Sequence, residues 1–449
     1  MSRSGLKSTA MKKSKLLLTL PCYCLIVNNC SPAQAQIAPD GSLSTNVTTE
    51  NNQNFTIEQG NRAGNNLFHS FREFSVPTGG EAFFNNAADI QNIFSRVTGG
   101  SVSNIDGLIR ANGGANLFLL NPSGIIFGPN ASLSIGGSFF ASTASSLIFS
   151  DGTQFSATNN QNSPLLTISV PIGLQYGNTV NPIRVQGLPG ATESFDTESK
   201  SLGVNKGNTL AILGGNVIID GGILQAPGGR IEVGGLAGEG TITIDEGGSL
   251  SFPSGGQRGD VSIINQAKIS VLAGGGGDIA INAQNLEISG ESLLASGIGR
   301  GLGMQGAKAG NISLNATGAI TITASSIQNN VNLGTQEQPA AIGDGGDIII
   351  KAGSTLATDK AYITAVTFGQ GNGGNIIIKA NTVSLTNGTY VDSFTGGIGN
   401  AGNIEINSKD NFVITGSRIS SSAIFKDSGD AGDISIVSDG SIFIHGNTR

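Results

Sequence analysis

The chain has 449 residues, including 68 glycines and no tryptophan, and only 12% of its residues are charged. A hydrophobic content of 38% excludes a disordered chain, and no mature segment has the run of about 18 apolar residues that a membrane-spanning helix needs. The formal net charge of −7 argues against a nucleic-acid partner, because an acidic chain repels phosphates.

The first 35 residues have the order of a secretory signal peptide. A basic stretch without acidic residues is followed by an apolar run over residues 16–27. Ala33 and Ala35 then form an Ala-x-Ala cleavage site before Gln36. We therefore expect the general secretory machinery to export the chain and residues 1–35 to be removed.

Removal of this segment changes the chemistry of the mature chain. All three cysteines precede residue 36, so no disulfide or cysteine-based metal site would remain. Five Lys or Arg residues are lost with the segment, so the mature net charge would be −7 − 5 = −12. A chain without thiols is suited to export in an unfolded state.

Two regions of the mature chain differ in composition. Thirteen of the 20 phenylalanines lie between residues 36 and 155, whereas Ile, Val and Leu dominate after residue 200. Bulky rings favour an irregular core or cap, and β-branched aliphatics favour stacked layers. We therefore divide the mature chain into an N-terminal domain at 36–160 and a repeat region at 161–449.

The repeat region contains a recurring unit: a small residue, Gly, then Asp or Asn, then alternating aliphatic residues. The unit occurs at 276–282, 309–315, 345–351, 373–379, 401–407 and 431–437, with a weaker copy at 258–264. Its Asp or Asn positions are spaced by 33, 36, 28, 28 and 30 residues, and they are Asp278, Asn311, Asp347, Asn375, Asn403 and Asp433.

A second alternating run follows each unit. Alternation with period two indicates half-buried strands, and a unit of two or three short strands can bury its inward face only by stacking on its neighbours. The sequence therefore predicts an all-β protein, a right-handed parallel β-helix with an N-terminal cap, whose Asp and Asn turn residues could form a ladder. At roughly 25–30 residues per coil, the mature chain would make about 14–17 coils.

No motif in the sequence indicates catalysis, a metal site or a cofactor. Of the two histidines, we expect His69 to pack against the cap and His445 to be exposed. The closest carboxylates in the repeats are Asp344 and Asp347, which we expect to be solvated turn residues. Calcium at such turns is left open. We therefore expect no enzymatic activity, with a β-helical polysaccharide lyase or hydrolase as the alternative.

A long ordered set of residues in segment 53–145 resembles the N-terminal secretion domain of filamentous haemagglutinin-type exoproteins, also called the haemagglutination activity domain. The matching stretches are NFTI at 54–57, NNLFHSFREFSV at 65–76, IFSRVTG at 93–99, IDG at 105–107 and NLFLLNPSGIIFG at 116–128. The stretch at 209–233 also resembles a recurrent block of the cyanobacterial members.

This resemblance implies a two-partner secretion system. Members of the family have a capped β-helix and cross the outer membrane through a dedicated β-barrel transporter, whose periplasmic POTRA domains read the secretion domain. Many members are adhesins. By this resemblance, the chain is a secreted, adhesin-like exoprotein found outside the cell or at its surface. Its partners are the transporter and a glycan or protein receptor on a host or another cell.

The resemblance also identifies a candidate secretion motif. Asn121, Pro122, Ser123, Gly124 and Ile125 occupy the family's Asn-Pro-Asn-Gly-Ile motif, with Ser123 in place of Asn. The family's second motif, Asn-Pro-Asn-Leu, is not found in the sequence. Pro and Gly at these positions predict that a strand ends at Asn121, turns and restarts at Ile125. The motif could be a turn of the cap, a signal for the transporter, or both.

Two further questions stay open, one about function and one about the length of the natural product. A structural sheath or matrix protein would have the same composition without a receptor. Nothing near residue 449 resembles the C-terminal cap that a solenoid needs for solubility, so we expect a longer natural product or a truncated reading frame.

Overall fold

The computed structural model describes residues 36–158, 166–188, 202–245, 247–425 and 428–446. Within these ranges the chain consists of strands, turns and irregular segments, and no helix there is able to cross a membrane. The predicted signal peptide, with Ala33 and Ala35, lies outside the described residues.

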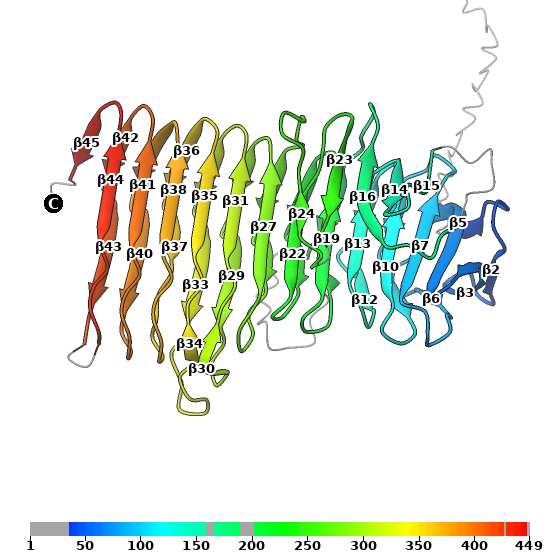
Figure 1. The fold of residues 1–449 in the computed structure, drawn as a ribbon, viewed down its shortest axis with the longest axis horizontal. Coiled ribbons are helices and arrows are strands. Elements are labelled where there is room, and N and C mark those ends of the chain that lie inside the picture. The colour runs from blue at the N-terminus through cyan, green and yellow to red at the C-terminus, as the bar shows by residue number, and fades with distance from the viewer. Residues whose placement is uncertain (1–35, 159–165, 189–201, 246, 426–427, 447–449) are drawn as a thin grey trace, which may run out of the picture. The chain divides into compact units, whose positions relative to one another are not determined.

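The first face of the fold is sheet 1, whose strands lie side by side in chain order (Figure 1). Its strands are β1 (Ile37–Pro39), β4 (Asn61–Ala63), β5 (Asn66–Phe74), β7 (Asn92–Val97), β10 (Asn116–Leu120), β13 (Phe139–Ser142), β19 (Thr209–Leu213), β22 (Arg230–Gly234), β27 (Asp278–Ala283), β31 (Ile312–Ala316), β35 (Ile348–Ala352), β38 (Ile376–Ala380), β41 (Ile404–Ser408) and β44 (Ile434–Ser438).

The second face is sheet 2, which contains eleven strands. They are β8 (Ser103–Ile105), β11 (Ile125–Phe127), β17 (Ile183–Gln186), β20 (Val217–Asp220), β25 (Val261–Ile264), β28 (Leu286–Ile288), β32 (Ile320–Thr323), β36 (Thr355–Asp359), β39 (Thr382–Thr386), β42 (Phe412–Thr415) and β45 (Ile442–His445).

The third face is sheet 3, which has two parts. The first part contains β2 (Thr45–Thr49), β3 (Asn54–Gln59), β6 (Glu81–Phe84), β9 (Leu108–Ala111) and β12 (Ser132–Ser134). The second part contains β18 (Leu202–Gly203), β21 (Ile223–Gln225), β26 (Lys268–Ser270), β29 (Leu293–Ile298), β33 (Ser326–Val331), β37 (Tyr362–Thr364), β40 (Tyr390–Thr395) and β43 (Arg418–Ala423).

The chain visits these faces in turn, and each strand pairs in parallel with the strand one coil later. In sheet 1, for example, Ile348 pairs with Ile376, which pairs with Ile404. Identical side chains therefore stack along the axis, and their inward faces form one continuous aliphatic core. Burial of each such side chain contributes about 1.5–3 kcal/mol. The prediction of a parallel β-helix is confirmed.

The N-terminal edge of the helix is closed by antiparallel strands. β1 pairs with β5 through Ile37 and Phe74, β4 pairs with the other end of β5, and β2 pairs with β3. Antiparallel pairing covers the strand edge that the first coil would otherwise expose. The predicted N-terminal cap is therefore present.

Two excursions leave the coils and form a separate antiparallel sheet, here called the covering sheet. Its strands, in spatial order, are β15 (Gln154–Ser156), β14 (Ser146–Phe149), β16 (Pro171–Tyr176), β23 (Gly240–Ile244) and β24 (Leu250–Ser251). It packs against the outer face of sheet 1 through a second hydrophobic core that includes Phe68, Phe94 and Phe118. A smaller excursion in the later coils forms the pair β30 (Gly303–Lys308) and β34 (Ile342–Asp344).

The structure corrects the interpretation of the aromatic region. Phe68, Phe94, Phe118 and Phe140 do not form an irregular core, because they occupy equivalent positions on regular strands of sheet 1. Phe118 and Phe140 stack with ring centroids 4.5 Å apart and planes 5° apart. The rings fill the space between sheet 1 and the covering sheet, a second layer that the repeats do not indicate.

The recurring units at 276–282 and beyond lie on successive strands of sheet 1, as predicted. The weaker copy at 258–264 was assigned wrongly, because it forms β25 in sheet 2. The predicted number of coils was also too high. Sheet 1 has 14 strands, and without the antiparallel β1 and β4 this leaves 14 − 2 = 12 stacked parallel strands in the described part of the chain. Long excursions account for the difference: Phe139 pairs with Leu210, 71 residues later.

The Asp and Asn residues of the repeats form the predicted ladder. At each step a side-chain oxygen accepts a hydrogen bond from the backbone N–H of the equivalent residue in the next coil, at 2.7–2.9 Å. The ladder runs through Asp278, Asn311, Asp347, Asn375, Asn403 and Asp433. It satisfies turn N–H groups that lie outside the sheet pairing.

Candidate functional site

The motif at 121–125 connects sheet 1 to sheet 2 within one coil, between β10 and β11. The N–H of Gly124 donates to the carbonyl of Asn121 at 3.0 Å, and the N–H of Ser123 donates to Asn121 Oδ1 at 2.9 Å. Gly124 has a φ of +112°, which favours glycine. The prediction that a strand ends, turns and restarts here is confirmed.

Asn121 is fully buried and connects three coils. Its Nδ2 donates to the carbonyl of Ser101 at 2.9 Å and to Ser103 Oγ at 2.8 Å, in the preceding coil. Its backbone N–H donates to the carbonyl of Ser142 at 2.9 Å, in the following coil. A buried amide with all donors satisfied is a strong local constraint, because an unsatisfied polar group in the interior costs about 1–3 kcal/mol.

Only part of the motif reaches the surface of the folded domain. Asn121, Gly124 and Ile125 are buried, whereas Pro122 and Ser123 are partly exposed. Asn181 Nδ2 further donates to the carbonyl of Pro122 at 2.8 Å. A partner that meets the folded domain could therefore contact only the tip of this turn.

A buried arginine connects the cap to the coils on the outer face of sheet 1. Arg96 of β7 is fully enclosed. Its Nε donates to Ser70 Oγ at 2.7 Å, its Nη2 donates to Ser42 Oγ at 3.0 Å, and its Nη1 donates to the carbonyl of Ser156. The guanidinium also lies 4.8 Å from the centre of the Phe155 ring. One side chain thus connects the cap, two coils and the covering sheet.

Asp40 supplies the negative charge of this network. Ser70 Oγ donates to Asp40 Oδ2 at 2.6 Å, and Thr98 Oγ1 donates to the same oxygen at 2.8 Å. Burial opposes ionisation of Asp40, but hydrogen bonds from Ser70, Ser42 and Thr98 outweigh it and lower its pKa below the ordinary value of 3.8. Burial lowers the pKa of Arg96, and the charge of Asp40 opposes that change. The buried Arg96 cation is therefore compensated by the partly buried Asp40 carboxylate.

Sequence reasoning did not identify this network or the asparagine row beside it. Asn92 Nδ2 donates to Asn66 Oδ1, and Asn116 Nδ2 donates to Asn92 Oδ1, both at 2.9 Å. The signal was present in the sequence: Asn-Leu-Phe at 66–68, Asn-Ile-Phe at 92–94 and Asn-Leu-Phe at 116–118 recur with spacings of 26 and 24 residues. This period defines the first coils. Arg96 has no comparable local signal, because its partners come from three separate segments, around residues 42, 70 and 156.

The two histidines lie where the sequence predicted. His69 is buried in the cap, stacked on Phe71 and edge-on to Phe84. Its burial lowers its pKa to about 3, so the ring is neutral near pH 7. His445 is exposed on β45. Neither histidine is placed to act as a metal ligand with the other.

The acidic residues of the repeats stabilise the turns by accepting hydrogen bonds from backbone N–H groups. Asp344 Oδ1 accepts from the N–H of Asn372 at 2.7 Å, and Asp347 belongs to the ladder described above. Within the described ranges, no group of three or more His, Cys, Asp or Glu residues could hold a metal ion. The sequence-predicted residues thus do not assemble into a catalytic constellation in this part of the chain.

Glu232 is an ionisable group that the sequence did not single out. It faces the covering sheet from β22, is 1% exposed, and forms an ion pair with Arg230 at 3.0 Å. Burial raises its pKa to about 7, a change that Arg230 only partly offsets. Among the residues that the structure describes, its Oε2 has no hydrogen-bond partner. This carboxyl lies at the point where the covering sheet ends.

Gln36, the residue expected to begin the mature chain, belongs to the cap. It is exposed, and its carbonyl accepts from the N–H of Ser75 at 3.0 Å. β1 begins at the next residue. The other two residues of the predicted cleavage signal, Ala33 and Ala35, lie outside the described part of the chain.

The structure defines the protein as a capped parallel β-helix with a buried turn. Comparisons with known proteins identify its family. The model of the TPS secretion domain family matches residues 35–281, more than half of the chain. The chain therefore belongs to the two-partner secretion domain family, whose members are exported exoproteins. Asn121–Ile125 and the cap both lie within the matched residues, and the match extends beyond the expected boundary at residue 160.

A solved structure agrees with the fold. The crystal structure of the HMW1 secretion domain from Haemophilus influenzae has a TM-score of 0.51 and 16% identity, and the match covers 91% of this chain and 98% of that one. The crystal structure of the filamentous hemagglutinin secretion domain has a TM-score of 0.35 and 15% identity, with 91% and 99% covered. At 16% identity the likeness to the HMW1 secretion domain concerns the fold alone. No curated protein matches.

Proposed function

We propose that this protein is an adhesin-like exoprotein that a cognate β-barrel transporter with POTRA domains carries across the outer membrane. The observation that most directly supports this proposal is the family match over residues 35–281, which contains the cap and the motif. The signal peptide at 1–35 would first deliver the chain to the periplasm through the general secretory machinery. We assign the secretion domain to 36–160, which lies within the matched region, and the β-helix repeats to 161–449, which extend beyond it.

The burial of the motif supports a particular order of events. In the folded domain Asn121 is enclosed and its donors are occupied. In an extended chain all five residues, Asn121 to Ile125, are accessible. The transporter would therefore read this segment before folding, and folding outside the cell would then bury it. The absence of cysteine after residue 30 supports such a route, because no disulfide can form before translocation.

The proposed function of the exported protein is adhesion through the outer surfaces of the stacked coils. A parallel β-helix repeats the same outward positions along its axis, so one type of contact recurs at intervals of about 4.8 Å. Such a surface suits a partner that itself repeats. A glycan or protein on another cell surface would be the receptor.

Secretion in cells that carry a cognate transporter tests the first part of this proposal. We expect the intact protein in the medium and a deletion of residues 53–145 in the periplasm. A matched control is a deletion of residues 348–403, because it removes two coils of 28 residues in register and lies beyond the family match. Secretion of both deletions at the intact level, or of none of the three proteins, would contradict the proposal.

A further inference from the structure

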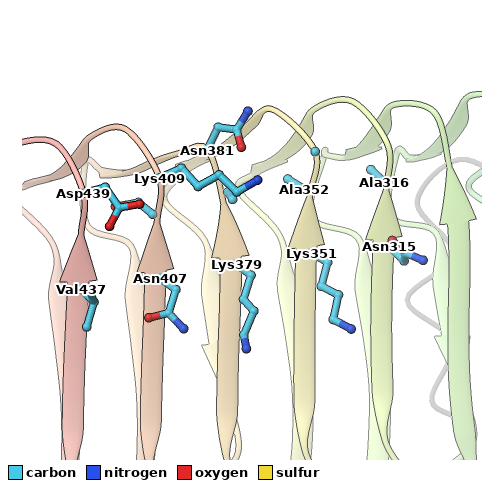
Figure 2. A pocket seen from close by; sticks show the side chains of 13 residues that line it. Asn315, Ala316, Lys351, Ala352, Lys379, Asn381, Asn407, Lys409, Val437 and Asp439 are labelled. Atoms are coloured by element: carbon cyan, nitrogen blue, oxygen red, sulfur yellow. The ribbon is translucent and has the colours of Figure 1, made fainter.

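A shallow groove crosses the outer face of sheet 1 in the later coils, beyond the residues that the family model matches. Figure 2 shows its central row, with Asn315, Lys351, Lys379, Asn407 and Val437 on five successive strands. These residues pair directly in the strand register. The row therefore runs along the axis with one side chain per coil.

The two lysines at the centre of this row break a rule of sheet design. Lys351 and Lys379 are direct neighbours on parallel strands and both are exposed. Like charges directly opposite each other destabilise a sheet. A third cation, Lys409, lies in the turn after β41 and lines the same groove. In Figure 2 its side chain extends toward Asn381, in the turn of the neighbouring coil. Repulsion between the two paired lysines costs stability, and such a local conflict is typical of functional sites, which favours a role in binding.

The positive charge of the groove is only partly neutralised by the protein. Lys379 Nζ lies 3.5 Å from Glu405 Oε1, and Asp439 also lines the groove. Among the residues that the structure describes, neither Lys351 nor Lys409 forms an ion pair. Three ammonium groups thus line the groove, against one carboxylate in its lining, Asp439, and one beside it, Glu405.

This cluster also contrasts with the composition around it. Between residues 311 and 446 the sequence has six basic residues, and three of them line the groove. The six are Lys351, Lys360, Lys379, Lys409, Arg418 and Lys426. In a chain with an acidic excess, this local concentration of cations attracts a negatively charged partner.

Polar and apolar groups beside the lysines narrow the type of partner. Asn315 and Asn407 extend the row with amide donors and acceptors. Ile349 and Ile377, next to the lysines on the same strands, are half-buried and present an apolar strip. Amides for hydroxyl groups, apolar surface for the C–H faces of sugar rings, and ammonium groups for acids together match a charged sugar polymer better than a simple ion.

We propose that this groove binds an acidic polysaccharide that lies along the axis of the β-helix. The carboxylate or sulfate groups would pair with Lys351, Lys379 and Lys409. An extended chain of pyranose rings advances by about the spacing of adjacent strands, roughly 4.8 Å, so successive sugars meet successive coils. The inference deepens the proposed adhesive function by naming the receptor class, and it does not depend on the transporter.

Binding of the purified full-length protein to immobilised polymers tests this inference. The probes are polygalacturonate for carboxylates, dextran sulfate for sulfates, unmodified dextran as the neutral polymer, and double-stranded DNA as a phosphate polyanion. We expect one or both of the acidic polysaccharides to bind, more weakly as salt rises, and the stronger of the two identifies the preferred anion. No binding to either, or equally tight binding of neutral dextran or DNA, would overturn the proposal.

Lysine variants locate the site. Lys351→Gln with Lys379→Gln should weaken binding by roughly tenfold, because two exposed charge contacts are lost. The arginine pair, K351R with K379R, should retain binding. The matched control is Lys308→Gln with Lys360→Gln, which removes the same charge from exposed positions outside the groove. Equal loss in the control pair, or no loss in the groove pair, would refute the site. Normal secretion of every variant separates this result from a failure of the secretion proposal.

Discussion

The early and late coils of sheet 1 share one backbone geometry but differ in what covers their outer face. A single column of paired residues runs through both regions: Phe68, Phe94, Phe118, Phe140, Ala211, Glu232, Ala280, Ser313, Ile349 and Ile377. The early members are buried beneath the covering sheet, and the late members face outward. The comparison shows that strand pairing alone does not determine whether an outward side chain is buried or exposed. The presence of a second layer determines it.

The largest expected effect separates the two ends of this column. Phe94→Ala should lower the free energy of unfolding by about 4 kcal/mol, because it leaves a cavity between two packed layers. Ile377→Ala should cost less than about 1 kcal/mol, because that side chain is only half-buried. Urea unfolding followed by far-ultraviolet circular dichroism measures both. Similar costs at the two sites would mean that the covering sheet does not pack as described.

A smaller effect, on the pH dependence of the free energy of unfolding, is expected at Glu232, where the covering sheet ends. Its folded pKa of about 7 lies above the ordinary value of 4.5, so the folded state holds the proton more tightly than the unfolded state. This contribution to stability is complete below pH 4.5, is lost as the pH rises from 4.5 to 7, and does not change above pH 7. The total change is on the order of 3 kcal/mol.

Glu232→Gln tests this assignment because glutamine has the same shape and no charge. The variant should be more stable than the natural chain at pH 8, should lose that advantage below pH 4.5, and should show a flatter dependence of the urea midpoint on pH. The exposed Glu337→Gln is the control and should leave the profile unchanged. Parallel profiles for Glu232→Gln and the natural chain would contradict a buried carboxyl at this junction.

The smallest effect on the free energy of unfolding is expected in the Asp and Asn ladder of the late coils. Asp347→Ala removes the acceptor for the backbone N–H of Asn375 and should cost about 1 kcal/mol. Asp347→Asn retains a side-chain oxygen and should be nearly neutral. Hydrogen exchange of the Asn375 amide should accelerate in the alanine variant alone. Equal exchange in both variants would mean that the ladder does not protect these turns.

Much of the fold could be predicted because the late coils are nearly regular. Units such as GGDIIIK at 345–351 place an aliphatic strand after a turn, and their spacing equals the length of a coil. The secretion motif was predicted to be a turn because Pro122 restricts the backbone locally and Gly124 permits a positive φ. The copy at 258–264 was misplaced because sheets 1 and 2 favour the same alternating pattern.

The burial of the motif and the arginine network could not be predicted in this way. Asn121 is enclosed by Ser101, Ser103 and Ser142, whose arrangement requires coils before and after it. Arg96 meets partners as distant as Ser42 and Ser156. Contacts across so many residues depend on register, and a local pattern of residues does not specify the register of distant strands.

The sequence by itself determined the strand class, the length of the late coils, the ladder and the turn at 121–125, because each depends on residues close in sequence or on exact repetition. Only the tertiary structure decided which outward positions are covered and which stay open. The covering sheet inserts between coils without a repeat of its own, and it buries Phe94 and Glu232 while the row at Lys351 and Lys379 remains exposed. Burial is a property of layers that meet in space, whereas strand formation is largely a property of local alternation.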